Sequence, residues 1–250
     1  MTPTHEIPSP ALVTGASRGF GRAIAAALHA GGAEVVAVAR SAEPLAELHR
    51  ELGDRLTPVV ADAADPGVAG TLIDRYQPRT LVLNAGAEPL LRPLHHHTWE
   101  TFSRNWDVDV RQAFGWVREA LLRPLPPGST VVAMSSGAAV AGSPLSGGYA
   151  GAKATIRFLT AYAADESARA GLGIRFVSLL PKLTAATDLG AAAVAAYARR
   201  AGLEVADHLA RMGPGLTPED VGKATLDLAG SPDRAPGAYL LTPAGLSPLD

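Results

Sequence analysis

The sequence predicts a single α/β domain over residues 1–250, in which a doubly wound parallel sheet carries helices on both faces. At 250 residues with 47% hydrophobic composition, the chain is long enough to bury one large core. Short apolar runs alternate with longer amphipathic stretches, which is typical of repeated βα units. The apolar runs are rich in Val and Leu and lack polar alternation, as expected for strands covered on both faces.

The apolar runs predict the strands of the sheet. They are Ala11–Thr14, Glu34–Ala39, Thr57–Ala61, Thr80–Leu83, Thr130–Met134, Ile174–Leu180 and Ala238–Leu241. No interdomain linker and no internal repeat interrupts this succession.

Helices are expected between these runs, and several have recognisable ends. Ser41 is placed to cap a helix over Glu43–Leu52, which Gly53 would end. Thr217 precedes a proline and two acidic residues, which suit the start of a late helix. The alanine-rich stretch Gly190–Ala201 predicts a helix because alanine has the highest helix propensity.

Composition excludes several classes of protein. The formal net charge is -2 without a basic run, so neither a nucleic-acid partner nor a polybasic membrane anchor is expected. The chain has no cysteine, which excludes disulfides and thiolate chemistry. Residues Met1–Pro10 lack the pattern of a signal peptide, and no apolar stretch has the length of a membrane span. We therefore expect a cytoplasmic protein.

A glycine-rich turn, Thr14–Gly21, follows the first strand and opens a helix. Gly15 permits the tight turn, Gly19 lets the backbone approach a pyrophosphate, and Gly21 allows the helix to lie close to the sheet. Free N–H groups at the start of that helix would face the anion. Such glycines also mark plain structural turns, but the strand–turn–helix context favours nucleotide binding.

The motifs together resemble one family. TGASRGFG is similar to the TGxxxGxG fingerprint of the compact short-chain dehydrogenases/reductases, and Asn84–Gly86 resembles that family's NAG motif. Tyr149 and Lys153 match its YxxxK active-site motif. Ser136 lies 13 residues before the tyrosine (149 − 136), where the family places its catalytic serine.

The resemblance covers residues 11–241 and implies a Rossmann-like fold with a nicotinamide cofactor. It also implies which residues contact that cofactor: Gly15, Ser17, Arg18, Gly19, Phe20, Gly21, Arg40, Asp62, Ala63, Asn84, Ala85, Gly86, Tyr149, Lys153, Pro181, Leu183 and Thr187.

The end of the second strand indicates which cofactor is preferred. A carboxylate there would select NAD, whereas this chain has Ala39 followed by Arg40, whose guanidinium suits a phosphate. Arg18 is similar to a second basic residue of the NADP-preferring members. Either arginine alone is equally well explained as a solvated surface charge, but the pair favours NADP(H). Asp62 and Ala63 match the family's adenine-contacting pair, although a simple turn at the strand end explains them nearly as well.

The reacting groups follow from the spacing on one helix. Tyr149 and Lys153 are four residues apart and share a helix face, where an ammonium favours the phenolate. The tyrosine could then exchange a proton with a carbonyl or alcohol oxygen, and Ser136 would donate a hydrogen bond to the same oxygen. In the family, the lysine also holds the nicotinamide ribose. The alternative is an exposed helical Tyr/Lys pair.

Two positions depart from the family pattern. Asp109 stands where the family usually has an asparagine that supports a proton relay, unless Asn105 has that role. Asp109 is the preferred assignment. Lys182 replaces the glycine of a Pro-Gly pair after Pro181, and Thr187 lies one residue later than usual. Lys182 either faces a polar or anionic substrate or is a solvent-exposed loop side chain, and the second interpretation is favoured.

The remaining features are interpreted as structural. The histidines His95–His97 point in different directions on a loop or helix start, so no metal site is expected, and Thr98 can cap the next helix. Aromatic residues crowd that helix and are expected in the core or, by resemblance to the family, on a homo-oligomer face. They are Trp99, Phe102, Trp106, Phe114 and Trp116.

The sequence therefore predicts an NADP(H)-dependent oxidoreductase, specifically a ketone reductase, with Tyr149 as general acid/base. It would interconvert a carbonyl and an alcohol on a small or medium-sized molecule, as a homodimer or homotetramer. A substrate lid is expected over residues 183–212, and the loop Ala87–His97 should add to specificity. The alternatives are an NADP(H)-binding regulatory protein or pseudoenzyme, motivated by Asp109 and Lys182, and a structural interaction protein.

Overall fold

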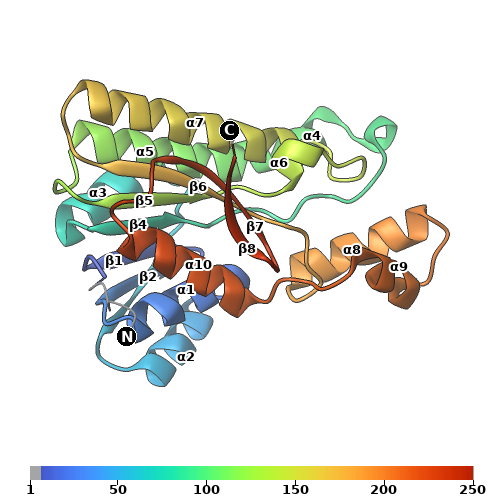
Figure 1. Cartoon of the computed structure of the whole chain (residues 1–250), viewed down its shortest axis with the longest axis horizontal. Coiled ribbons are helices and arrows are strands. Elements are labelled where there is room, and N and C mark those ends of the chain that lie inside the picture. Colours follow the sequence, from blue (N-terminus) through green and yellow to red (C-terminus); the bar gives the residue numbers. More distant parts are fainter. Residues whose placement is uncertain (1–6, 250) are drawn as a thin grey trace.

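The computed structural model describes residues 7–249, so most of the segment Met1–Pro10 lies outside the described residues. Within them the chain forms one eight-stranded sheet in the order β3-β2-β1-β4-β5-β6-β7-β8. The strands β1 to β7 pair in parallel, and β8 pairs antiparallel with β7. This order and the helices on both faces confirm the predicted doubly wound α/β fold (Figure 1).

The strand bounds are β1 (Ala11–Thr14), β2 (Val35–Ala39), β3 (Leu56–Val60), β4 (Thr80–Leu83), β5 (Thr130–Met134), β6 (Arg175–Pro181), β7 (Gly237–Thr242) and β8 (Gly245–Leu249). The continuous Val/Leu runs become strands that are buried on both faces, as in β1, β2, β4 and β5.

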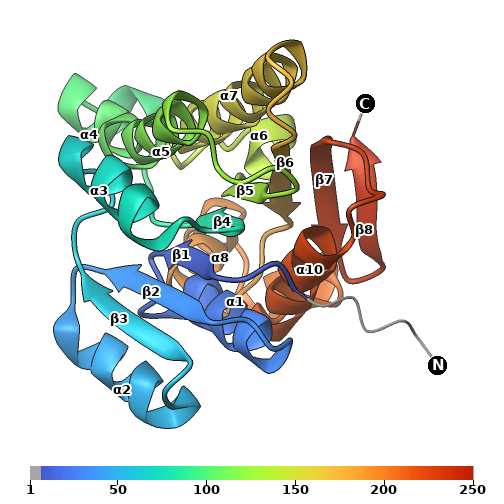
Figure 2. The ribbon, with the colours of Figure 1, turned by 90° about the vertical axis from the view of Figure 1, so that its left-hand side faces the viewer.

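Helices cover the two faces of the sheet in separate groups (Figure 2). The helices α3, α5 and α7 lie on one face, and α1, α2 and α10 lie on the other. The helix bounds are α1 (Gly19–Ala30), α2 (Ala42–Leu52), α3 (Pro66–Tyr76), α4 (Trp99–Asn105), α5 (Arg111–Leu122), α6 (Ala138–Ala141), α7 (Tyr149–Arg169), α8 (Asp188–Arg200), α9 (Val205–Met212) and α10 (Pro218–Gly230), with a 3-10 helix η1 (Leu94–His96) and a π-helix η2 (Trp106–Val110).

The expected helix ends agree with the structure in part. Thr217 and Asp220 form a reciprocal capping box on α10, and Thr98 caps α4 in the same way with Thr101. Ser41 precedes α2, but its side chain makes no capping hydrogen bond, so that part of the prediction was wrong.

The strand β8 was not predicted. Its sequence is short and contains a proline, so the local pattern does not identify a strand. The strand forms because it pairs with β7, whose edge would otherwise be open to solvent and is covered by this short hairpin.

The strand order indicates where in this sheet a ligand would be expected to bind. The chain reverses its winding direction between β1 and β4, which are neighbours in the sheet although two strands separate them in sequence. Ligands of doubly wound sheets bind at such a switch point, beyond the carboxyl ends of the strands. The loops that follow β1 and β4 there carry the glycine turn and Asn84.

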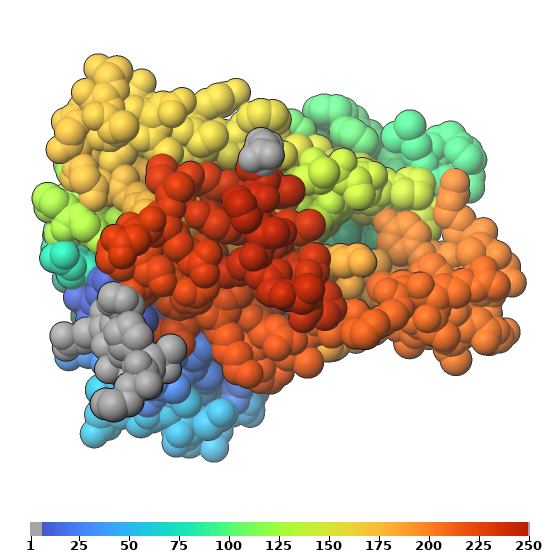
Figure 3. Space-filling model, in the orientation of Figure 1, coloured from blue at the N-terminus to red at the C-terminus, as the bar shows by residue number. Residues whose placement is uncertain are grey.

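The helices α8 and α9 form a lobe at the end of the molecule (Figure 3). In the space-filling view this orange lobe projects beyond the sheet and the helices that cover it. Both helices lie within the segment 183–212 that was expected to act as a lid, and the predicted alanine-rich helix is α8, which begins two residues earlier than expected.

Candidate cofactor and active site

A cavity of about 460 Å³ lies at the carboxyl ends of the strands, on both sides of the switch point. Its walls contain every cofactor-contacting and catalytic residue expected from the sequence except Gly21. The fold thus brings together residues from position 15 to position 187. The same walls include residues that had no predicted role, among them Glu88, Gln112 and Asp188.

The glycine turn has the backbone that its sequence requires. Gly15 and Gly19 adopt φ of 67° and 53°, in the left-handed region that favours glycine. Gly21 does not line the cavity, and a side chain there would overlap the Gly15 carbonyl oxygen and the Asn84 amide. The start of α1 has neither a side-chain cap nor an acidic residue, so its N–H groups are free to donate hydrogen bonds to an anion in the cavity.

The end of β4 is fixed to the end of β1 by a polar network. The buried Thr14 hydroxyl donates to Gln112 Oε1 at 2.6 Å and accepts the N–H groups of Asn84 and Ala85. The Asn84 side chain donates to the carbonyl oxygens of Thr14 and Gly15, both at 3.2 Å. The network holds the glycine turn against the loop after β4. Gln112 shows no motif in sequence, so its role is visible only in the fold.

A buried ion pair lies at the base of the cavity. Lys153 Nζ is 3.1 Å from Asp109 Oδ2 and donates to the Met134 carbonyl oxygen at 3.1 Å. The carboxylate uses its other oxygen to accept the Ala87 N–H at 2.8 Å. Asp109 is 1% exposed and Lys153 is 6% exposed. Both charges are therefore removed from water and partnered, as buried charges must be.

The π-helix η2 places Asp109 in this position. A π turn widens a helix locally and often occurs at functional sites, and here it lies between α4 and α5. Gly86 faces the carboxylate so closely that an added Cβ would be 2.9 Å from Asp109 Oδ2. Asn105, the alternative candidate for the relay position, donates to the Ala87 carbonyl oxygen at 2.8 Å and is 2% exposed. Asn105 therefore braces the loop and also donates to Asp109 Oδ1 at 3.4 Å, while Asp109 contacts the lysine.

The ion pair determines the charge of the lysine. Burial alone would lower the pKa of Lys153, but the adjacent Asp109 carboxylate and, to a smaller extent, Tyr149 raise it above its ordinary value. The side chain is therefore an ammonium throughout the physiological pH range.

Tyr149 and Ser136 complete the reactive end of the cavity. Tyr149 begins α7, one turn before Lys153, and the lysine Nζ is 5.6 Å from the centre of the phenol ring. Ser136 follows β5, and its hydroxyl oxygen accepts the Ala138 N–H at 3.2 Å. Both side chains line the cavity. The arrangement supplies two hydroxyl groups and a fixed positive charge around one space.

The opposite end of the cavity is formed by the ends of β2 and β3. Arg40, exposed and without a resolved ion pair among residues 7–249, follows the buried Ala39. Asp62 accepts the Ala64 N–H at 3.0 Å, which is the turn geometry expected at a strand end, and it also lines the cavity with Ala63. The Ala63 carbonyl oxygen accepts a hydrogen bond from the buried Trp116 indole at 3.0 Å.

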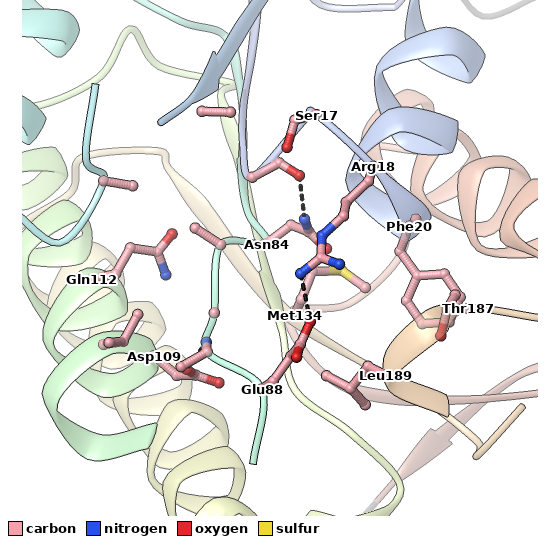
Figure 4. A pocket seen from close by; sticks show the side chains of 18 of the residues that line it. Ser17, Arg18, Phe20, Asn84, Glu88, Asp109, Gln112, Met134, Thr187 and Leu189 are labelled. Atoms are coloured by element: carbon pink, nitrogen blue, oxygen red, sulfur yellow. Dashed lines mark hydrogen bonds and ion pairs between the residues drawn. The ribbon is translucent and has the colours of Figure 1, made fainter. Parts of the chain in front are cut away.

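Arg18 has partners that the sequence did not suggest. Its guanidinium donates to Glu88 at 2.6 Å, the ion pair drawn in Figure 4, and to Asp188 at 3.3 Å. The three groups come from the glycine turn, the loop after β4 and the start of α8. Arg18 therefore connects the lobe to the sheet in this structure, in place of a free guanidinium directed at a phosphate. Glu88 follows the NAG segment by two residues, but no pattern in the sequence assigns it this role.

The segment after β6 closes the cavity on the side of the lobe. Pro181 and Leu183 lie in its wall, and Thr187 caps α8 by accepting the Gly190 N–H. Lys182 is exposed and also lines the wall.

The histidine cluster has structural contacts. His97 bonds through its ring nitrogens to the Arg92 carbonyl oxygen and to the Thr101 hydroxyl, both at 3.2 Å. Residues 7–249 contain no group of three His, Cys, Asp or Glu side chains arranged to hold a metal ion. Nor does any helix among them have the length and apolarity to span a membrane.

The fold and the cavity together define a dinucleotide-binding α/β protein. The comparison with known families is more specific: the model for short chain dehydrogenases matches residues 9–198, and the chain belongs to that family of oxidoreductases.

Similar proteins include several reductases and dehydrogenases. Human L-xylulose reductase is 40% identical over 100 residues, which cover 40% of this chain and 41% of the relative, so the matched part spans about two fifths of that protein's length. Porcine carbonyl reductase [NADPH] 2 is 38% identical over 104 residues, 42% of each chain. Cis-4-hydroxycyclohexanecarboxylate dehydrogenase of Sinomonas cyclohexanicum is 32% identical over 176 residues, 67% of this chain and 71% of the relative.

A solved structure agrees along nearly the whole chain. It is assigned as an NAD(P) dependent gluconate 5-dehydrogenase from Beutenbergia cavernae with bound NADP at low occupancy. It aligns with a TM-score of 0.80 and 29% identity, covering 95% of this chain and 96% of that one.

Proposed function

We propose that this protein is an NADP(H)-dependent oxidoreductase that interconverts a carbonyl and an alcohol on a small or medium-sized molecule. The observation that carries the proposal is the buried Lys153 ammonium, held 5.6 Å from the Tyr149 ring in the wall of the cavity. A fixed positive charge beside a phenol stabilises its ionised form and so assists proton transfer.

Each reacting side chain has a separate task. Tyr149 exchanges a proton with the substrate oxygen, as acid in reduction and as base in oxidation. Ser136 donates a hydrogen bond to that oxygen while negative charge develops on it. Lys153 supplies the positive charge and a donor for the ribose hydroxyls, and Asp109 orients Lys153 and raises its pKa. When bound, the nicotinamide supplies or accepts the hydride.

The residues of the cavity fit a dinucleotide. The uncapped start of α1 provides N–H groups for the pyrophosphate, and the left-handed Gly15 and Gly19 let it approach. NADP(H) is the proposed form because Ala39 leaves the end of β2 without a carboxylate and Arg40 offers a guanidinium there. The names of the porcine NADPH carbonyl reductase and of the NADP-containing bacterial structure support the same choice.

The experiment that tests this function pairs a substrate panel with one variant. NADPH absorbance is followed while ketones, aldehydes and quinones are supplied to the wild type and to Tyr149→Phe. We expect carbonyl-dependent loss of NADPH in the wild type and almost none in the variant, which lacks the proton to donate. Fluorescence titration should show similar NADPH affinity for both proteins. Equal turnover in the two would contradict the assignment of Tyr149.

A regulatory NADP(H)-binding protein is the second candidate. The ion pair of Asp109 with Lys153 favours it, because a carboxylate at this position offsets part of the positive charge that assists the tyrosine. Tight NADPH binding with no turnover across a broad panel would support this candidate.

Assembly into a homodimer or homotetramer is also proposed. Large apolar side chains are exposed on α5 and α7, which pack against each other (Figure 1). They are Phe114, Leu122, Phe158 and Tyr162, with exposures of 53–62%. Exposed apolar side chains gathered on two helices that pack together are suited to a protein interface. Light scattering coupled to size exclusion measures the mass of the assembly.

A further inference from the structure

A second cavity, of about 220 Å³, lies between the lobe and the end of the sheet. Two cationic side chains, Lys182 and Arg211, line it together with apolar walls that include Met212, Leu216 and Pro243. Arg211 belongs to the last turn of α9. The site therefore combines a positive end with a surface suited to a hydrocarbon chain.

The second cavity adjoins the reactive end of the first. Lys182 and Leu183 line both cavities. The backbone of this segment also contacts the turn after the catalytic serine, because the Gly137 N–H donates to the Pro181 carbonyl oxygen at 2.9 Å. A Cβ added to Gly137 would be 3.6 Å from Lys182 Cα. A substrate whose carbonyl lies at Ser136 can thus extend toward Lys182.

Lys182 and Arg211 have no carboxylate partner in the described part of the chain, because the acidic groups nearby are already partnered by other residues. Neither Lys182 nor Arg211 forms an ion pair with a carboxylate among residues 7–249. The acidic side chains in the wall of the first cavity have other partners: Asp109 pairs with Lys153, Glu88 and Asp188 pair with Arg18, and Asp62 accepts a backbone N–H at the far end. The charged side chains that line the second cavity, Lys182 and Arg211, are both cationic.

We propose that the second cavity is a subsite for a carboxylate group of the substrate. Lys182 and Arg211 bind the carboxylate, the apolar walls contact the carbon chain, and the carbonyl or hydroxyl carbon lies between Ser136 and Tyr149. The inference rests on the proposed function and narrows its substrate to oxo acids or hydroxy acids. Charge-assisted hydrogen bonds of this type provide both affinity and orientation.

Matched probes test the subsite. The first is 4-oxopentanoate and the second is 4-oxopentanamide, which has nearly the same shape and no charge. We expect a higher kcat/KM for the acid in the wild type. Lys182→Gln and Arg211→Gln should each lower the acid-to-amide ratio about tenfold, mainly through KM, since a hydrogen bond to a charged group is lost. Arg200→Gln removes an exposed cation on α8 that lines neither cavity, and the ratio should not change.

The possible outcomes distinguish a failure of the proposed subsite from a failure of the proposed function. The subsite proposal would be overturned if Lys182→Gln and Arg211→Gln lowered kcat/KM equally for both probes, or if the wild type showed no preference for the acid. Either result would leave the reductase assignment in place. If neither probe nor the wider carbonyl panel is reduced, the proposed function fails. In that case saturation-transfer NMR decides about the subsite: 4-oxopentanoate should bind the NADPH complex of the wild type and not the double variant. Absence of binding to the wild type would overturn it.

Discussion

The replacement Asp109→Asn tests the electrostatic design of the site most directly. The amide has almost the shape of the carboxylate, and its oxygen can still accept the Ala87 N–H. Its other end becomes an NH₂ group that cannot pair with the Lys153 ammonium. The lysine keeps its hydrogen bond to the Met134 carbonyl oxygen. The variant thus removes one negative charge and preserves most of the geometry.

The magnitude follows from two distances. The Asp109 carboxylate is 3.1 Å from Lys153 Nζ, which is 5.6 Å from the Tyr149 ring centre, so the carboxylate is at most about 9 Å from the phenol ring. At an effective dielectric constant of about 20, repulsion by the carboxylate over this distance destabilises a phenolate by about 2 kcal/mol. Tyr149 is partly exposed, so solvent screening reduces the effect to about one pH unit.

The assay is the pH dependence of alcohol oxidation with NADP⁺, in which the tyrosine acts as base. We expect the acidic limb of kcat/KM to move about one pH unit lower in Asp109→Asn, because the ionised phenol is no longer repelled. Asp107→Asn is the matched control, since Asp107 lies on the same π-helix but is exposed and bonds to Ser103. If the acidic limb of the kcat/KM profile lay at the same pH in Asp109→Asn and in the wild type, the electrostatic explanation would be refuted.

The same variant changes stability in a pH-dependent way. The raised pKa of Lys153 in the folded protein means that the ion pair stabilises the fold fully below the ordinary lysine value of about 10.4, and that this stabilisation is lost as pH rises from there through the higher pKa of the folded protein. Removing one partner of a buried pair costs about 3 kcal/mol. Urea unfolding should show this loss for Asp109→Asn near neutral pH, and the difference from the wild type should shrink in strongly alkaline buffer.

Three further predictions concern the cofactor site and the scaffold. Ala39→Asp combined with Arg40→Gln should shift preference from NADPH toward NADH, because a carboxylate repels the 2′-phosphate and accepts the ribose hydroxyl. Unchanged NADPH preference in the ratio of kcat/KM values would exclude Arg40 from phosphate binding. Gly21→Ala should weaken NADPH binding and cost about 1–3 kcal/mol of stability because its methyl group overlaps the glycine turn, whereas Gly115→Ala, with open space around it, should do neither. Thr217→Ala should lower the free energy of unfolding by about 1 kcal/mol through loss of the α10 cap, and an unchanged urea midpoint would contradict the capping role.

Much of the fold could be predicted from local sequence, because its causes are local. Buried strands of a parallel sheet need unbroken apolar runs, and the predicted bounds of β1, β4 and β5 agree with the structure. The glycines of the turn are required by backbone conformation, and spacing alone identifies them. The hairpin strand β8 was not predicted because its residues have little strand propensity. Its formation is explained only by pairing with the open edge of β7.

The sequence by itself identified the motif residues that line the cavity, because the motifs lie at the ends of strands and the sheet brings those ends together, whereas Glu88, Gln112 and Asp188 join them only in the tertiary structure. The tertiary structure alone decided how their charges are partnered. Asp109 pairs with a lysine 44 residues later (153 − 109), and Arg18 pairs with carboxylates at positions 88 and 188. Coulomb interactions depend on separation in space and on burial, and neither quantity follows from distance along the chain.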